Sequence, residues 1–276
     1  MPTPSRAPSR LTRVALAAAL IALCSLPRPA RAADDAPAPA NPPPAAEPAP
    51  SPTPLAVAGI RKTEPKSGLV FVSIPGGHFQ YQGARPTSVN PFLLGEGPVT
   101  IEAWTWCFKA GACSAPGTGD RCNWKSDRAG HPINCVNHKQ ATSFCKWIGG
   151  RLPTEQEREF VATGGEGRRY PWGTAEPAAR ACWDGEGSEL GQGRRKGTCY
   201  VGSYKDGDSK WGLHDLAGNV WEWTSSDYSE DHTNKVVRGA SYQANDESEL
   251  FAVRRRSRDP NNRTDYLGLR CALDPK

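Results

Sequence analysis

The residues best suited to bind a metal ion lie in one short stretch, Gly212 to Thr224. Asp215 and Glu222 are two carboxylates within it, and Gly218-Asn219 between them predicts a tight turn. Hard cations such as Ca²⁺ take carboxylate and backbone carbonyl oxygens from irregular loops of this kind. The same residues fit a purely structural turn, in which Asp215 caps nearby N–H groups and two tryptophans fill the core. On the residues alone both interpretations stay open.

A second group of possible metal ligands is less specific. Asp246, Glu247 and Glu249 form an acidic run that could hold a hard metal, although such runs are more often solvated loops. A non-haem iron centre usually takes two histidines and a carboxylate, and no spacing brings together the five histidines: His78, His131, His138, His214 and His232. A serine hydrolase is excluded, because no Gly-x-Ser-x-Gly elbow surrounds Ser241.

A basic run follows the acidic one and comprises Arg254, Arg255, Arg256 and Arg258. It fits either a strand edge with exposed arginines or a cleft that grips acidic groups through bidentate contacts. We favour the strand edge.

The first 32 residues have the features of a secretory signal. A basic start precedes the apolar run Val14 to Leu26, which is too short for a membrane span, and Ala30-Arg31-Ala32 supplies a cleavage site. We therefore expect an exported chain (periplasmic, cell-surface or extracellular) that begins at Ala33 and has no transmembrane helix. The signal carries five arginines and no acid, so the net charge of +5 falls to about zero in the mature chain. Such a balance argues against nucleic-acid binding.

Eight of the nine cysteines remain after the signal, since Cys24 leaves with it. An even count in an exported chain predicts disulfides. A zinc site is disfavoured, because the spacings give no paired C-x-x-C or histidine ligands.

The positions of Pro, Gly and apolar residues divide the rest of the chain. Residues 33–66 are predicted to be a disordered Pro/Ala-rich linker, and residues 67–276 a single folded domain. Leu69 to Gly77 reads as a strand that turns at Gly76-Gly77 into a returning strand, His78 to Tyr81. Capping signals predict three helices, starting after Thr100, Asn137 and Thr154 and stopping at Gly111, Gly149-Gly150 and Gly164-Gly165. Val236–Arg238 and Leu267–Arg270 are the remaining predicted strands, so the fold class is α+β with little regular secondary structure.

Taken together, these segments resemble the formylglycine-generating enzyme (sulfatase-modifying factor) family. The resemblance runs from about Gly68 to Asp274 and rests on ordered motifs: Ile74-Pro75-Gly76-Gly77, Gly150 to Glu155, Tyr170-Pro171-Trp172-Gly173, Gly212 to Thr224, Arg238 to Tyr242 and Leu267 to Cys271. It implies a compact variant of the C-type-lectin-like fold.

The resemblance also implies a structural Ca²⁺ site in which Asp215 and Glu222 give side-chain oxygens and Gly218 and Val220 give backbone carbonyls. The family's second calcium site would need an asparagine where this chain has Ala181, and we expect a Cys182–Cys199 disulfide in its place. The family pattern also links Cys145 to Cys271. The other four cysteines, Cys107, Cys113, Cys122 and Cys135, form two bonds whose pairing stays open.

Active members of the family oxidise a substrate cysteine to formylglycine with Cu(I) bound by two cysteine thiolates, which are the soft ligands that Cu(I) prefers. Ala244 and Glu249 occupy these two positions, and no cysteine lies between Cys199 and Cys271. We expect no copper and no catalytic residues.

The prediction is a monomeric, calcium-stabilised module that binds a protein, peptide or glycan in a lectin-like cleft. The alternatives are an active oxidase with a rearranged metal site, acting on sulfatases or using non-haem iron, and a purely structural envelope protein.

Overall fold

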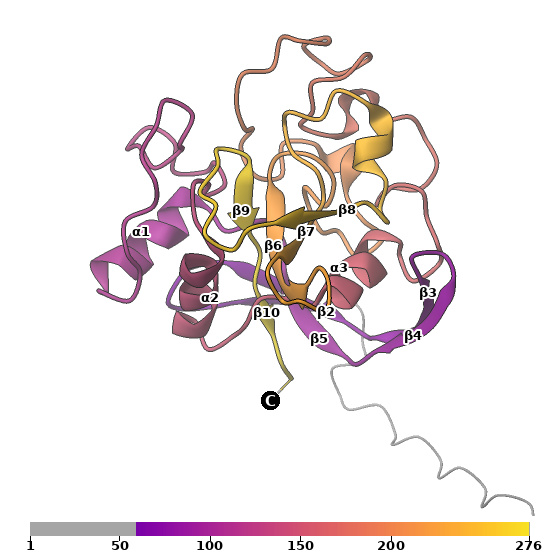
Figure 1. Ribbon diagram of the computed structural model, residues 1–276, viewed down its shortest axis with the longest axis horizontal. Coiled ribbons are helices and arrows are strands. Elements are labelled where there is room, and N and C mark those ends of the chain that lie inside the picture. The colour runs from indigo at the N-terminus through magenta and orange to yellow at the C-terminus, as the bar shows by residue number, and fades with distance from the viewer. Residues whose placement is uncertain (1–58, 276) are drawn as a thin grey trace, which may run out of the picture. The chain divides into compact units, whose positions relative to one another are not determined.

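A computed structural model describes residues 59–275, and its first sheet joins the two ends of this region (Figure 1). The strands are β1 (Arg61–Thr63), β2 (Val70–Ile74), β5 (Phe92–Gly95) and β10 (Ala272–Leu273), all antiparallel in the order β1-β2-β5-β10. Strand β1 falls within the predicted linker, so folded structure begins earlier than the sequence indicated. The predicted signal peptide lies outside the described residues.

A separate two-stranded sheet follows, formed by β3 (Gly77–Tyr81) and β4 (Arg85–Val89). The predicted pairing of the strand at Leu69–Gly77 with His78–Tyr81 is therefore wrong. Strand β2 is buried along nearly its whole length and pairs with β1 and β5 instead. Gly76 has a φ of +72°, and a Cβ there would lie 2.3 Å from the Val89 carbonyl oxygen. Gly76-Gly77 thus connects β2 in the first sheet to β3 in the two-stranded sheet.

The third sheet has the order β8-β7-β6-β9 and includes residues of three of the six sequence motifs. Its strands are β6 (Trp221–Asp227), β7 (Lys235–Arg238), β8 (Arg255–Arg258) and β9 (Leu267–Leu269). The predicted strands near Val236 and Leu267 are confirmed. Strand β6 was not predicted; it pairs in parallel with β9 and antiparallel with β7, which makes it an inner strand.

Three α-helices start at the predicted caps. They are α1 (Ile101–Lys109), α2 (His138–Trp147) and α3 (Glu155–Ala162), preceded by Thr100, Asn137 and Thr154. Reciprocal capping boxes close the starts of α2 and α3, as the sequence predicted. Short 3-10 turns add η2 (Ala178–Arg180), η3 (Lys205–Gly207) and η4 (Glu247–Leu250). No helix within residues 59–275 is long and apolar enough to cross a membrane.

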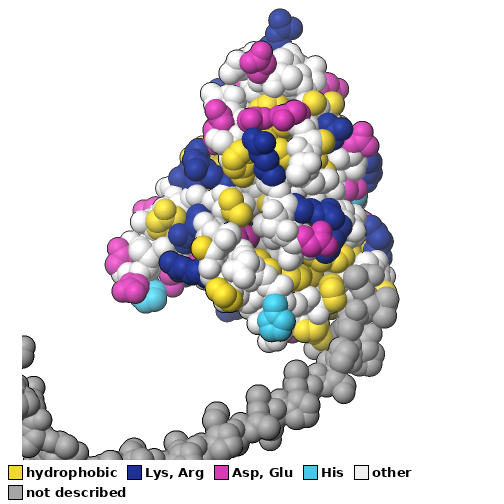
Figure 2. Space-filling view, turned by 90° about the vertical axis from the view of Figure 1, so that its right-hand side faces the viewer, with side chains coloured by type: hydrophobic (Ala, Val, Ile, Leu, Met, Phe, Trp, Pro, Cys, Tyr) yellow, Lys and Arg dark blue, Asp and Glu magenta, His cyan; other side chains and the backbone are white. Residues whose placement is uncertain are grey.

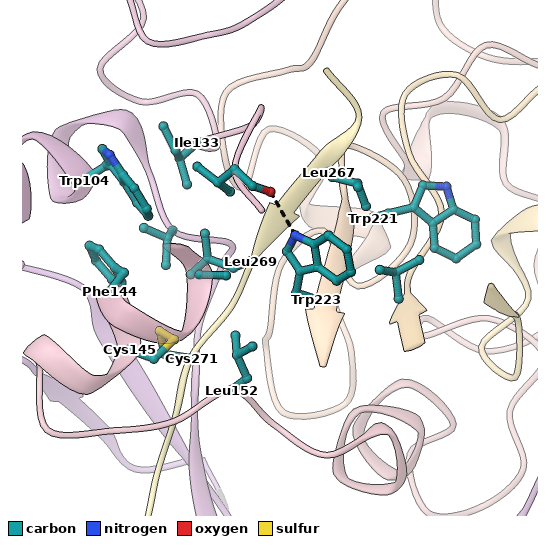
Figure 3. Packing of buried hydrophobic residues seen from close by; sticks show 14 of the residues in the cluster. Trp104, Ile133, Phe144, Cys145, Leu152, Trp221, Trp223, Leu267, Leu269 and Cys271 are labelled. Carbon is teal, nitrogen blue, oxygen red and sulfur yellow. Dashed lines mark hydrogen bonds between the residues drawn. A yellow bond between two sulfur atoms is a disulfide. The ribbon is translucent and has the colours of Figure 1, made fainter. Parts of the chain in front are cut away.

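Large aromatic side chains connect α1 and α2 to the third sheet (Figure 3). The Trp104 and Phe144 rings stack with centroids 5.5 Å apart. The Trp223 indole N–H donates to the Val136 carbonyl oxygen at 2.9 Å, so this buried ring is anchored by packing and by a hydrogen bond. A core made of a few large anchors fits a domain with short strands.

All eight predicted cysteines form disulfides. Cys145 pairs with Cys271 and Cys182 with Cys199, as the family resemblance implied. The two pairs that the sequence left open are Cys107–Cys113 and Cys122–Cys135.

Removing the Cys145–Cys271 bond should destabilise the domain far more than removing Cys107–Cys113. The sequence separations are 126 and 6 residues, and the chain-entropy model gives losses of about 5 and about 2 kcal/mol for loops of these lengths. Urea unfolding of C145A/C271A and C107A/C113A measures both values. All four cysteines are buried, so C107A/C113A controls for the space that is left when two buried sulfur atoms are removed. Equal losses would contradict the loop-length argument.

Candidate functional site

The two positions at which the family resemblance expects copper ligands have structural contacts in this chain. Ala244 is 2% exposed, and its carbonyl oxygen accepts the Asp184 N–H at 2.8 Å. Glu249 lies on η4, and its carboxylate takes the Arg256 guanidinium at 2.5 Å. Neither side chain offers a soft ligand, and the carboxylate that could hold a harder metal is already neutralised by an arginine.

The rest of the acidic run is also engaged. Asp246 caps η4 by accepting the Ser248 N–H at 2.8 Å. Glu247 accepts the Tyr170 hydroxyl at 3.3 Å, and its hydrogen bond to Glu176 raises the pKa of the Glu176 carboxyl. Within residues 59–275 no three His, Cys, Asp or Glu side chains form a group that could hold a metal ion.

Asp246 and Glu247 border a cavity of about 520 Å³, which is also lined by Asn245, the residue after Ala244. The lining comes from the segment Asn245 to Glu247, from the Glu176–Ala178 turn and from the loop that Cys182–Cys199 closes. The lining combines carboxylates with the Trp183 ring and the side-chain amides of Gln192 and Asn245. In Figure 1 the segments that line this cavity gather at one end of the domain, around η4.

Three arginines of the basic run lie on the edge strand β8, as predicted, and exposed Arg254 precedes the strand. The arginines on the strand are half-buried and not exposed as predicted: Arg255 binds Glu155 at 2.9 Å, and Arg256 binds Glu249. The guanidinium carbon of Arg258 lies 5.5 Å from the centre of the Tyr266 ring.

The five histidines do not meet. Each has its own partner: His78 with Ser88, His131 with Thr198, His138 with the Thr224 carbonyl, His214 with Asp208 and His232 with Asp227. The histidine-based iron site considered from the sequence is therefore not assembled.

The stretch from Gly212 to Thr224 folds as a loop that leads into β6. Asp215 is 8% exposed and accepts the Gly202 N–H at 2.8 Å, and burial raises the pKa of its carboxyl. Gly218 has a φ of +86°, and a Cβ there would lie 2.6 Å from the Cys182 carbonyl oxygen. A glycine is thus required where the loop passes the Cys182–Cys199 bond.

Sequence reasoning gave Asn219 no role beyond the turn, yet its side chain fastens this loop. The Asn219 side-chain oxygen accepts the Cys199 N–H at 3.1 Å, and the side-chain N–H donates to the Cys199 carbonyl oxygen at 3.3 Å. The backbone N–H of Asn219 donates to the Cys182 carbonyl oxygen at 2.8 Å. Asn219 is fully buried and has a φ of +63°, a conformation that asparagine tolerates better than most residues. The Gly218-Asn219 pair was the feature of the sequence that could have indicated this left-handed conformation.

Glu222 lies at the start of β6 between two buried arginines. Its Oε2 is 2.6 Å from Arg158 Nε, and its Oε1 is 2.8 Å from Arg270 Nη2. All three side chains are at most 1% exposed. Burial alone would raise the pKa of the Glu222 carboxyl, but the two guanidinium groups outweigh it and lower that pKa. Burial also lowers the pKa of Arg158 to about 10, which still leaves it charged at neutral pH.

The predicted calcium ligands fit a Ca²⁺ ion poorly as a set. Both Glu222 oxygens already accept guanidinium N–H groups, and the Asp215 Oδ2 accepts a backbone N–H. Arg158 also donates to the Leu216 carbonyl oxygen at 3.0 Å, inside the same loop. A dication at Glu222 would lie beside two buried positive charges, where screening by water is weak. Calcium binding at these residues stays a prediction that the contacts do not favour.

Neutralising Glu222 should destabilise the domain strongly. The variant E222Q leaves two buried guanidinium groups without a counter-charge, and we expect a loss of about 3–5 kcal/mol. The control is E96Q, which removes the partner of half-exposed Arg61 at 2.7 Å and should cost about 1 kcal/mol or less. Chemical unfolding at neutral pH gives both values. A loss for E222Q no larger than that for E96Q would mean that the buried pairs contribute little.

Comparison with known proteins identifies the family of this chain. A family model described as the sulfatase-modifying factor enzyme 1-like domain matches residues 58–275. The inactive C-alpha-formylglycine-generating enzyme 2 of Bos taurus is 36% identical over 184 residues, which cover 62% of this chain and 57% of that relative. The formylglycine-generating enzyme of Mycobacterium tuberculosis is 30% identical over 232 residues, which cover 71% of this chain and 76% of the relative.

Among solved structures, PvdO from Pseudomonas aeruginosa has a TM-score of 0.65 and 20% identity, and the match covers 79% of this chain and 99% of that one. At this identity the likeness concerns the fold alone. The family match spans all described residues and includes every motif on which the resemblance rested. The chain therefore belongs to the sulfatase-modifying factor enzyme 1-like family, the family of the formylglycine-generating enzymes.

Proposed function

We propose that this protein is an exported binding module of the formylglycine-generating type that does not carry out the copper-dependent oxidation. One observation carries the proposal: the two copper-ligand positions hold Ala244, buried in the core, and Glu249, paired with Arg256. A Cu(I) site needs thiolates at both positions. The eight remaining cysteines are all bonded to each other, so none is left to replace them.

The comparisons are consistent with loss of activity without deciding it. The first relative is named an inactive formylglycine-generating enzyme, whereas the mycobacterial relative is named as an enzyme. The support for an inactive protein therefore comes from Ala244 and Glu249 of this chain. Export is supported by the four disulfides, which persist in oxidising compartments.

The ligand is expected in the cavity lined by Asn245, Asp246 and Glu247. An aromatic ring, two amides and several carboxylates line it, a mixture suited to a peptide that carries a positive charge. Figure 2 shows one face of the molecule, on which basic and acidic side chains alternate without forming a large patch of one sign. Nothing on that face favours a nucleic acid. Calcium is not part of the proposal, because the Glu222 oxygens are already bound by arginines.

Copper binding separates a binding module from an oxidase. The wild type should bind no Cu(I) in competition with a chelator, and a sulfatase-type Cys-x-Pro-x-Arg peptide incubated with it should keep its mass. The variant A244C/E249C should bind about one Cu(I), since it restores two thiolates. The matched control is A244S/E249S, which should bind none. Formylglycine formation by the wild type would overturn the proposal.

The same peptide tests the binding role. Isothermal calorimetry with the wild type should detect binding without turnover, and E176Q/E186Q should weaken it about tenfold by removing two carboxylates from the cavity wall. The control is E166Q, whose carboxylate pairs with Lys210 and Arg168 away from the cavity. Equal weakening by E166Q, or no binding at millimolar peptide, would contradict a peptide-binding cavity.

A further inference from the structure

Helix α3 sends one arginine into the loop where the family resemblance expects a metal ion. The Arg158 side chain is 1% exposed and reaches two different oxygens. Its Nε donates to the Glu222 carboxylate at 2.6 Å, and its Nη2 donates to the Leu216 carbonyl at 3.0 Å. A carboxylate oxygen together with a loop carbonyl oxygen is the type of pair that a Ca²⁺ ion would bind here.

We propose that the Arg158 guanidinium is the resident cation of this loop, in the place that the family resemblance gives to calcium, so that the domain folds without Ca²⁺. The proposal does not depend on the proposed binding function, because it concerns how the loop is held and not which ligand the cavity takes. It states that a side chain supplies a charge that a diffusible ion would otherwise supply.

The space around the guanidinium supports this assignment. A Cβ added at Gly239 would lie 2.8 Å from Arg158 Nη2 and 3.1 Å from the Leu216 carbonyl oxygen. Because Gly239 has no side chain, it leaves room for the Arg158 guanidinium between α3 and the loop that contains Leu216. Gly218 N–H also donates to the Gly239 carbonyl at 2.7 Å, so the loop closes tightly around this point.

The charges around Glu222 disfavour an additional cation. Arg270 binds the same carboxylate at 2.8 Å and also donates to the carbonyl oxygens of Gly95, Glu96 and His214. Two guanidinium groups thus share one carboxylate in a site closed to water. Asp215, the only other carboxylate in the predicted shell, accepts the Gly202 N–H. A Ca²⁺ ion at Glu222 would face uncompensated positive charge from both sides.

The first measurement uses the wild-type protein, folded under oxidising conditions. Its melting temperature should be the same in EDTA and in millimolar CaCl₂, and elemental mass spectrometry should find no stoichiometric calcium. A calcium-dependent rise in melting temperature that D215N abolishes, with about one calcium per chain, would overturn the proposal and establish the four-ligand shell.

Two variants test whether Arg158 is the reason that the domain does not require calcium. R158M removes the charge with little change in volume; it should lower the melting temperature in EDTA and recover roughly 5 °C or more in saturating CaCl₂. R270M is the matched control, because it removes the other guanidinium from Glu222 and leaves Arg158 in place. It should be destabilised and insensitive to calcium. A folded R158M that ignores calcium, or an equal calcium response in R270M, would overturn the assignment. If R158M does not fold, the wild-type metal content decides.

Discussion

Pairing of buried charges is the constraint on which this fold depends. Helix α3 is only eight residues long and buries four charged side chains: Glu155, Glu157, Arg158 and Glu159. Arg158 connects it to Glu222 on β6, and Glu159 binds Arg238 on β7 at 2.6 Å. Breaking one buried pair leaves a charge without compensation, which costs far more than the pair contributes. The helix, the loop before β6 and the third sheet are therefore linked by buried charge pairs in addition to the apolar packing of Phe160 and Val161.

What could be predicted from the sequence was mostly local. The cap residue Asn137 and its partner Gln140 are three residues apart, so the start of α2 could be read directly. Disulfide pairing over 126 residues was accessible only through the family resemblance. The pairing of β3 with β4, and β6 as an inner strand, depend on which distant strands offer an edge, and no local pattern encodes that.

The sequence identified candidate ligand groups but not the partners that these groups have in the structure. The acidic run, the histidines and the loop at Asp215 were all identified as potential ligands, and the structure gives nearly all of them another partner. Arg158 was not singled out, because an arginine on a short polar helix is usually exposed. Its burial is decided by Glu222, 64 residues away. The sequence around a motif therefore shows which side chains could bind a metal ion or a ligand. Contacts between distant parts of the chain decide which of these side chains already have another partner.

Ala244 stands where the family resemblance expects a cysteine, and the fold does not require a cysteine there. Ala244 contributes to the structure through its backbone, which accepts the Asp184 N–H and donates to the Ser241 carbonyl, and these bonds need no particular side chain. The side chain at position 244 can therefore differ without loss of the backbone hydrogen bonds that hold this part of the fold.

The C-terminal residues 267–273 have a consequence for biosynthesis. Strand β9 pairs with β6, Arg270 binds Glu222, Cys271 bonds to Cys145, and β10 pairs with β5. Seven consecutive residues thus complete two sheets, a charge cluster and the longest covalent loop. A nascent or prematurely terminated chain has both sheets open at one edge and a buried carboxylate short of one partner. Such a chain presents the unpaired strands on which proteases and chaperones act. The two sheets, the charge cluster and the Cys145–Cys271 bond are therefore completed only once residues 267–273 are in place.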